Sequence, residues 1–162
     1  MHSNATKTES DDSGDFEKFE CNSQYSHGEN EKIVEKELSY KLTGIFFNVQ
    51  KELGRFCREK QYGDALEKKF TEEKINFKRE SPIEIANRKS NFADFIIENK
   101  VLLELKTKNF IDKEDYYQTQ RYLDNANLHL GIIINFQQEH LKPKRVVNPK
   151  FQSIKNNLNG GH

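Results

Sequence analysis

The chain has 162 residues and contains few cysteines and no long hydrophobic run. Its two cysteines, Cys21 and Cys57, form neither a C-x-x-C pair nor a multi-cysteine framework. This excludes a disulfide-stapled fold and favours a reducing compartment. No apolar run approaches the ~20 residues that cross a bilayer, and the first residues lack the apolar segment of a signal peptide. We therefore expect a cytoplasmic protein with no membrane partner.

The chain also lacks a net charge, because 26 basic residues balance 26 acidic ones. The balance hides an asymmetry. Residues 1–31 carry eight acidic residues and two lysines, a net charge of −6, so the remaining residues carry +6. A basic domain is compatible with an anionic partner such as nucleic acid. An ordinary soluble surface explains the charge equally well.

Composition divides the chain into a domain and two tails. Residues 1–30 are rich in Ser, Asp, Glu, Asn and Gly and show no apolar period, and the mean hydropathy of the whole chain is −0.95. We expect residues 1–30 to form a disordered acidic tail, residues 31–149 one domain, and residues 150–162 a flexible C-terminal tail. The acidic tail either covers the basic domain electrostatically or serves only to solubilise it.

Apolar periodicity predicts a mixed α/β fold with the order α-α-β-β-β-α-β-β. The expected helices span about 33–53, stopped by Gly54, then a stretch ending near residue 74, and 112–127, with Asp112 as N-cap. The expected strands span 75–85, 91–98, 101–107, 128–136 and 145–147, with a turn at 87–90. Two strongly aliphatic strands flank the last helix, which predicts a parallel crossover within a mixed central sheet.

One predicted strand, residues 101–106, carries two charged side chains on the same face. In the sequence Val-Leu-Leu-Glu-Leu-Lys of residues 101–106, Glu104 and Lys106 point the same way because strand side chains alternate. Asp94 interrupts the preceding aliphatic strand. If facing residues of this hairpin have numbers that sum to 198, Asp94 lies opposite Glu104; if they sum to 199, the two acids lie on opposite faces. We predict the first register.

Two facing carboxylates and a lysine suit phosphodiester hydrolysis. Mg²⁺ takes oxygen ligands and prefers sites that it shares with phosphate oxygens, and it lowers the pKa of an attacking water. A lysine such as Lys106 can position that water or neutralise developing charge. A structural salt bridge between Glu104 and Lys106 explains the pair about as well.

Two helical pairs extend this pattern. Gln118 and Tyr122 are four residues apart and share one helical face, although a surface glutamine and a core tyrosine would give the same spacing. Glu59 and Tyr62 lie near the start of the second helix. Glu59 could extend the metal site, or it could only stabilise the helix start through its charge.

Together these motifs resemble the GxxExxY protein family of the PD-(D/E)XK nuclease superfamily. The resemblance covers roughly residues 35–148 and ends in the Gly-Ile-Ile-Ile-Asn-Phe run of residues 131–136. It implies a restriction-endonuclease-like core with a metal-dependent nuclease site. It further implies Asp94 and Glu104 as metal ligands, with Lys106, Glu59, Gln118 and Tyr122 as catalytic residues, the last two forming a Q-x-x-x-Y motif.

Two residues depart from the family pattern. Phe56 stands where the family has its name-giving glycine, and Phe92 stands where an arginine is frequent. We expect a nuclease that uses Mg²⁺, with Mn²⁺ as a substitute, and acts on nucleic acid, DNA rather than RNA. The alternatives are a catalytically inactive nucleic-acid-binding or regulatory module, and an interaction partner that uses the acidic tail. The sequence is compatible with a homodimer. Two interpretations also remain for Lys142, Lys144 and Arg145, which either contact phosphate or form a solvated basic loop.

Overall fold

The computed structural model of the protein describes residues 33–151, except for the side chains of Lys89 and Ser90. The acidic tail expected over residues 1–30, Cys21, and residues 152–162 of the expected C-terminal tail lie outside the described residues. Within residues 33–151, no helix is long and apolar enough to cross a membrane.

The described residues form three helices and one five-stranded sheet, in the predicted order. The helices are α2 (Lys36–Leu53), α3 (Glu59–Glu72) and α4 (Lys113–Ala126), and the strands are β1 (Phe77–Ile85), β2 (Arg88–Ile97), β3 (Val101–Lys106), β4 (Leu130–Asn135) and β5 (Lys144–Val147). The mixed α/β fold expected from the sequence is therefore confirmed. Gly54 ends α2 with a φ of 74°, and Asp112 caps α4 by accepting a hydrogen bond from the N–H of Asp115.

The turn expected at residues 87–90 is shorter than predicted. β2 already begins at Arg88, and Ile85 pairs with Arg88, so only Ala86 and Asn87 form the loop. Both loop residues have positive φ, 50° and 59°. A two-residue loop with positive φ at both positions matches the right-handed twist of the strands. Residues 88–90 therefore belong to the strand rather than to the loop.

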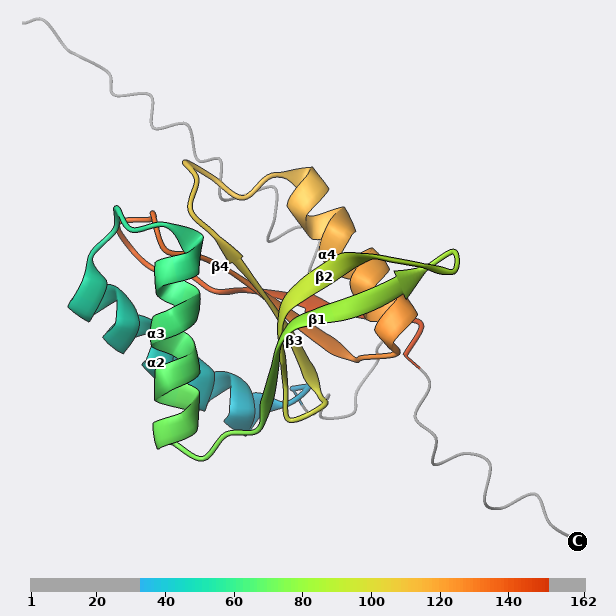
Figure 1. Cartoon of the computed structure of the whole chain (residues 1–162), viewed down its shortest axis with the longest axis horizontal. Helices are drawn as coiled ribbons and strands as arrows, with labels where there is room; N and C mark the ends of the chain where they lie inside the picture. Colours follow the sequence, from blue (N-terminus) through green and yellow to red (C-terminus); the bar gives the residue numbers. More distant parts are fainter. Residues whose placement is uncertain (1–32, 152–162) are drawn as a thin grey trace, which may run out of the picture. The chain divides into compact units, whose positions relative to one another are not determined.

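The strand order in the sheet is β1-β2-β3-β4-β5, and β3 lies at its centre. Neighbouring strands are antiparallel except for β3 and β4, which are parallel. The chain makes this parallel connection through α4, which confirms the predicted crossover. Figure 1 shows α2 and α3 together on one side of the sheet and α4 on the other.

Alternation along the strands divides the sheet into two faces. One face packs against α2 and α3 and forms the main core; its members from the central strands are Phe95, Ile97, Val101, Leu103, Leu105, Leu130, Ile132 and Ile134. The opposite face carries Asp94, Glu104 and Lys106 and lies under α4. At Gly131 the helix comes so close that an added Cβ would lie 2.7 Å from Thr119 Cγ2 and 3.2 Å from Leu123 Cδ1.

Polar anchors fix the two helices of the main core. Arg79 of β1 forms ion pairs of 2.7 Å with Asp64 and 2.6 Å with Glu67, both on α3. Arg145 of β5 donates to the hydroxyl of Ser39 on α2 and to the carbonyl of Val34. Arg145 was expected to contact phosphate or to lie in a solvated loop, and its guanidinium instead ties β5 to the start of α2.

Candidate active site

The β2–β3 hairpin adopts the register that brings the acids together. Its three pairs are Phe95–Leu103, Ile96–Leu102 and Ile97–Val101, so the facing numbers sum to 198 as predicted. Continuing this register places Asp94 opposite Glu104. The backbone pairs stop before this point, and the N–H of Leu105 donates instead to Asp94 Oδ2 at 2.6 Å. The Asp94 side chain thus replaces a backbone partner where the two strands separate.

Glu104 is a buried acid with an unsatisfied oxygen. The residue is only 3% exposed, and its Oε1 atom has no hydrogen-bond partner among the described residues. Its Oε2 lies 4.0 Å from Lys106 Nζ. Burial, reinforced by the negative charge of Asp94, raises the pKa of Glu104 to about 8, against the opposing effect of Lys106. A cation placed beside this buried carboxyl group would favour its charged form.

Asp94 shares this electrostatic environment. Burial raises the pKa of its carboxyl group, the hydrogen bond from Leu105 lowers it, and the charge of Glu59 raises it again. Glu80 of β1 acts in the same direction with a smaller effect. Several acids therefore repel one another around Asp94 and Glu104, and a divalent cation would relieve this repulsion.

The ammonium group of Lys106 is surrounded by oxygen atoms from α4. Its Nζ lies 3.5 Å from Gln118 Oε1 and 3.6 Å from Asp115 Oδ1. The same Gln118 donates from Nε2 to the hydroxyl of Tyr122 at 2.9 Å. The Q-x-x-x-Y face of α4 therefore reaches the Glu104-x-Lys106 strand, and Tyr122, which is only 4% exposed, supports Gln118 from the core side.

Glu59 approaches the same strand from the other helix layer. It is the first residue of α3, and its Oε1 accepts a 3.2 Å hydrogen bond from the N–H of Thr107, directly after Lys106. Tyr62 positions this helix start: its hydroxyl donates to the carbonyl of Gly54 at 2.5 Å and accepts from the N–H of Cys57 at 3.3 Å. The Tyr62 ring stacks on Phe136, with centroids 4.3 Å apart.

Sequence reasoning missed Asp115, a buried acid between two lysines. Asp115 is 7% exposed and contacts both Lys106 and Lys108. It also forms a reciprocal capping pair with Asp112, at 3.0 and 3.1 Å. Its position three residues before Gln118 places it on the same face of α4. The spacing of Asp115 and Gln118 could have indicated a site residue, but the N-terminal cap of α4 alone was enough to explain an acid at this position.

Asn135 is a second residue that sequence reasoning left without a role. It is fully buried, donates to the carbonyl of Lys108 at 2.7 Å and accepts from the N–H groups of Lys108 and Gln137 at 3.3 and 3.2 Å. Asn135 thus fastens the segment that leaves β3 after Lys106. Its partner Lys108 lies 27 residues away in sequence, which no local pattern reveals.

The donor set suits a hard divalent cation that retains water and substrate ligands. It offers the carboxylates of Asp94 and Glu104, including the unpartnered Glu104 Oε1. Within residues 33–151, no group of three His, Cys, Asp or Glu side chains is arranged to hold a metal ion. Two carboxylates completed by water and phosphate oxygens are typical of Mg²⁺ sites, whereas an all-protein cage is typical of Ca²⁺.

A central mixed sheet that presents two acids and a lysine beneath a helix defines a nuclease-type α/β domain. The chain belongs to the PD-(D/E)XK nuclease superfamily, whose family model matches residues 36–146. Nucleases of this superfamily generally use divalent metal ions and act on nucleic acid. Comparison with curated proteins and with solved structures gives no significant match.

Proposed function

We propose that this protein is a Mg²⁺-dependent nuclease that hydrolyses phosphodiester bonds, with DNA as its substrate and Mn²⁺ as an effective substitute ion. The observation that carries the proposal is the buried Glu104 carboxyl group, which has an unpartnered oxygen, faces Asp94 in register and lies 4.0 Å from Lys106. A purely structural salt bridge would not leave a buried carboxyl oxygen unsatisfied.

Each residue has a distinct part in the proposed reaction. Asp94 and Glu104 would hold the cation, and the backbone carbonyl of Leu105 is a third candidate ligand. The bound ion would polarise the phosphodiester and lower the pKa of the attacking water. Lys106 would orient that water and stabilise the negative charge that develops on the phosphate.

Residues on both helices support this centre. Gln118 fixes the direction of the Lys106 ammonium group through the 3.5 Å contact with its Oε1. Tyr122 in turn holds Gln118 through a 2.9 Å hydrogen bond. Glu59 would bind a water molecule at the edge of the site. Within the superfamily, the order of Glu59-x-x-Tyr62, Asp94, Glu104-x-Lys106 and Gln118-x-x-x-Tyr122 leads us to place the chain among the GxxExxY proteins.

Two exposed phenylalanines favour a second candidate, a catalytically inactive module that binds nucleic acid. Phe56 is 85% exposed and Phe92 is 52% exposed, and both stand where the GxxExxY pattern has a different residue type. These departures alter the surroundings of the site. They leave the two carboxylates and the lysine unchanged.

A cleavage assay separates the two functions. Labelled single- and double-stranded DNA and RNA are incubated with Mg²⁺, Mn²⁺ or EDTA, and Lys106→Ala is compared with wild type. We expect DNA cleavage that needs the metal and is lost in Lys106→Ala. The matched control is Lys150→Ala, which removes an exposed lysine paired with Asp124 near the opposite end of α4. Equal cleavage by Lys106→Ala and wild type would contradict the proposal, and salt-sensitive binding without any cleavage supports the inactive module.

A further inference from the structure

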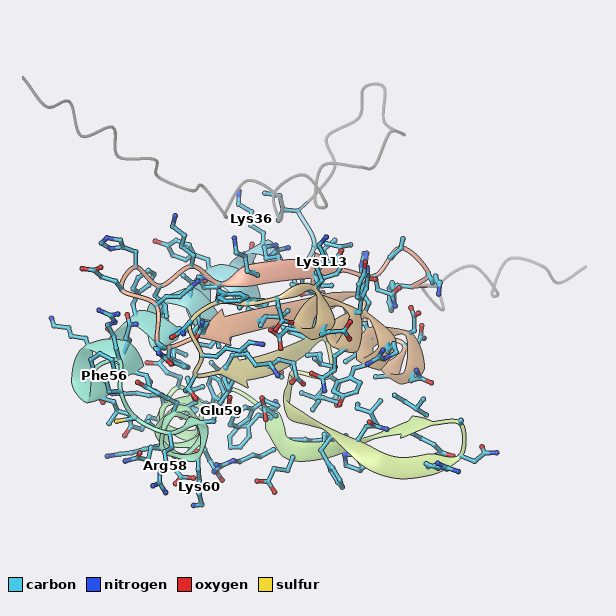
Figure 2. All side chains as sticks on the ribbon, turned by 90° about the horizontal axis from the view of Figure 1, so that it is seen from above. Lys36, Phe56, Arg58, Glu59, Lys60 and Lys113 are labelled. Carbon is cyan, nitrogen blue, oxygen red and sulfur yellow. The ribbon has the colours of Figure 1, made fainter. Side chains whose placement is uncertain are left out.

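A cleft of about 460 Å³ opens beside Glu59, at the start of α3. Its lining includes Arg55, Phe56, Arg58, Lys60 and Thr107 in addition to Glu59. We call it the Phe56 cleft. Figure 2 labels Phe56, Arg58, Glu59 and Lys60 around the start of α3. The cleft thus holds three cationic side chains and one acid.

The cationic side chains differ in how firmly they are held. Arg55 donates from Nε to the carbonyl of Gln137 at 3.0 Å, which uses one of its five N–H donors. Lys60 forms a 3.3 Å pair with Asp64, and both side chains are largely exposed, so this pair contributes little and can exchange for a phosphate. The cleft therefore presents to an anion the anchored guanidinium group of Arg55, the exchangeable ammonium group of Lys60 and the guanidinium group of Arg58.

Phe56 gives the cleft an aromatic surface. It is 85% exposed, and the Arg55 guanidinium carbon lies 5.4 Å from its ring centroid. A single exposed phenylalanine requires no explanation by itself. A ring held beside an anchored arginine at the mouth of a basic cleft has the two components with which proteins bind unpaired nucleotides, a stacking surface and a cation.

The cleft lies beside the end of the strand that carries the proposed metal centre, because Thr107 follows Lys106 and lines the cleft. Glu59 lines the cleft, and it is the acid that approaches the end of the Lys106 strand from α3. Thr107 lines the cleft as well, and it follows Lys106 in the chain and donates to Glu59. A nucleic-acid strand whose phosphate reaches Lys106 would therefore pass along the cleft with a neighbouring nucleotide.

We propose that the Phe56 cleft is a binding subsite for one unpaired nucleotide of a single-stranded nucleic acid. The base stacks on the Phe56 ring, and the adjoining phosphate binds between Arg55 and Arg58. This inference rests on the proposed nuclease function, because that function brings the strand to the cleft. The subsite selects single strands or frayed ends, because the faces of paired bases are already stacked on their neighbours.

The absence of tryptophan from the chain gives a direct test. Phe56→Trp introduces a single fluorophore at the subsite. In EDTA, where no cleavage occurs, we expect oligo-dT or oligo-rU to quench its fluorescence, and an abasic oligonucleotide of equal length to leave it unchanged. Comparison of the quenching by oligo-dT and by oligo-rU shows whether the subsite prefers DNA or RNA. The matched control is Tyr40→Trp on α2, because Tyr40 is 84% exposed and lies outside the cleft lining.

Affinity supplies the second readout. Fluorescence anisotropy in EDTA should show that Phe56→Ala weakens single-strand binding about tenfold, in keeping with the loss of one stacked base, while Phe56→Trp restores it. Equal quenching in Phe56→Trp and Tyr40→Trp, or unchanged affinity in Phe56→Ala, overturns the subsite. Metal-dependent cleavage with no Phe56 effect refutes the subsite alone. Phe56-dependent binding without cleavage by the wild type refutes the nuclease proposal and leaves the subsite intact.

Discussion

The carboxylate of Asp94 accepts a 2.6 Å hydrogen bond from the backbone N–H of Leu105. This bond lies where the pairing of β2 with β3 ends, so it closes the hairpin through one of the two Asp94 oxygens. Asp94 therefore serves the fold with one oxygen, and in the proposed reaction it would also bind the metal. The two roles can be separated by experiment.

Asp94→Asn separates these roles because an amide oxygen can still accept from Leu105. Removal of the Asp94 charge lowers the repulsion that raises the pKa of Glu104. We expect the metal-free variant to be as stable as wild type or more stable, and its Mg²⁺ affinity and cleavage rate to fall at least about tenfold. Urea unfolding in EDTA and calorimetric Mg²⁺ titration measure the two effects. A loss of stability with unchanged metal affinity would show that Asp94 is only structural.

The raised pKa of Glu104 predicts how stability depends on pH in EDTA. Between about pH 4.5 and about 8 the folded protein keeps this proton and the unfolded chain loses it, so the folded state binds more protons. The free energy of unfolding should therefore fall as pH rises through this range, and this contribution should level off above about pH 8. For a single titrating group, the free energy of unfolding changes by at most about 1.4 kcal/mol per pH unit.

Glu104→Gln should remove this part of the pH dependence, because the amide does not titrate. Urea unfolding at several pH values compares the variant with wild type, and Glu84→Gln, an exposed residue of β1, is the matched control. A slope that persists unchanged in Glu104→Gln would assign the pH dependence to other groups.

Asp115→Asn tests whether this buried acid positions Lys106. The amide can still complete the cap with Asp112, but it removes the negative charge between Lys106 and Lys108. Loss of the charge removes the 3.6 Å ion pair that holds the Lys106 ammonium group beside Gln118. We expect a drop in cleavage rate of about tenfold and a stability loss of about 1–3 kcal/mol. An unchanged cleavage rate with only lower stability would confine Asp115 to the helix cap.

Gly131→Ala tests the close packing of α4 on β4. The added methyl group would meet Thr119 Cγ2 at 2.7 Å, and Thr119 is fully buried and has a stiff, β-branched side chain. We expect a stability loss of about 1–3 kcal/mol from overpacking, together with slower cleavage, because displacement of α4 moves Gln118 away from Lys106.

Gly44→Ala is the matched control for this substitution. Gly44 lies inside α2 with no atom within 4 Å of the added methyl group, so the change should stabilise the protein by up to about 1 kcal/mol. Thermal unfolding of both variants gives the comparison. Equal stability of Gly131→Ala and wild type would mean that α4 can move away from the sheet without cost.

The parts of the site that could be predicted from sequence depend on short-range geometry. The strand period placed Glu104 and Lys106 on one face, the loop length limited the hairpin to two registers, and the helical period paired Gln118 with Tyr122. Longer-range features could not be predicted. The bonds of Arg145 to Val34 and Ser39 span more than 100 residues, and those of Asn135 to Lys108 depend on the parallel pairing of β4 with β3.

The placement of the site within the sheet has a consequence for how its specificity can change. Asp94, Glu104 and Lys106 lie on interior strands that are paired on both sides, whereas Phe56 and Arg58 lie in the connection between α2 and α3. If the Phe56 cleft binds the strand as proposed, substitutions in residues 55–58 would alter which strand ends are accepted without disturbing the strands that hold the carboxylates. Selection would then change the substrate of the proposed nuclease through exposed positions such as Phe56 and Arg58, while Asp94, Glu104 and Lys106 stay in place.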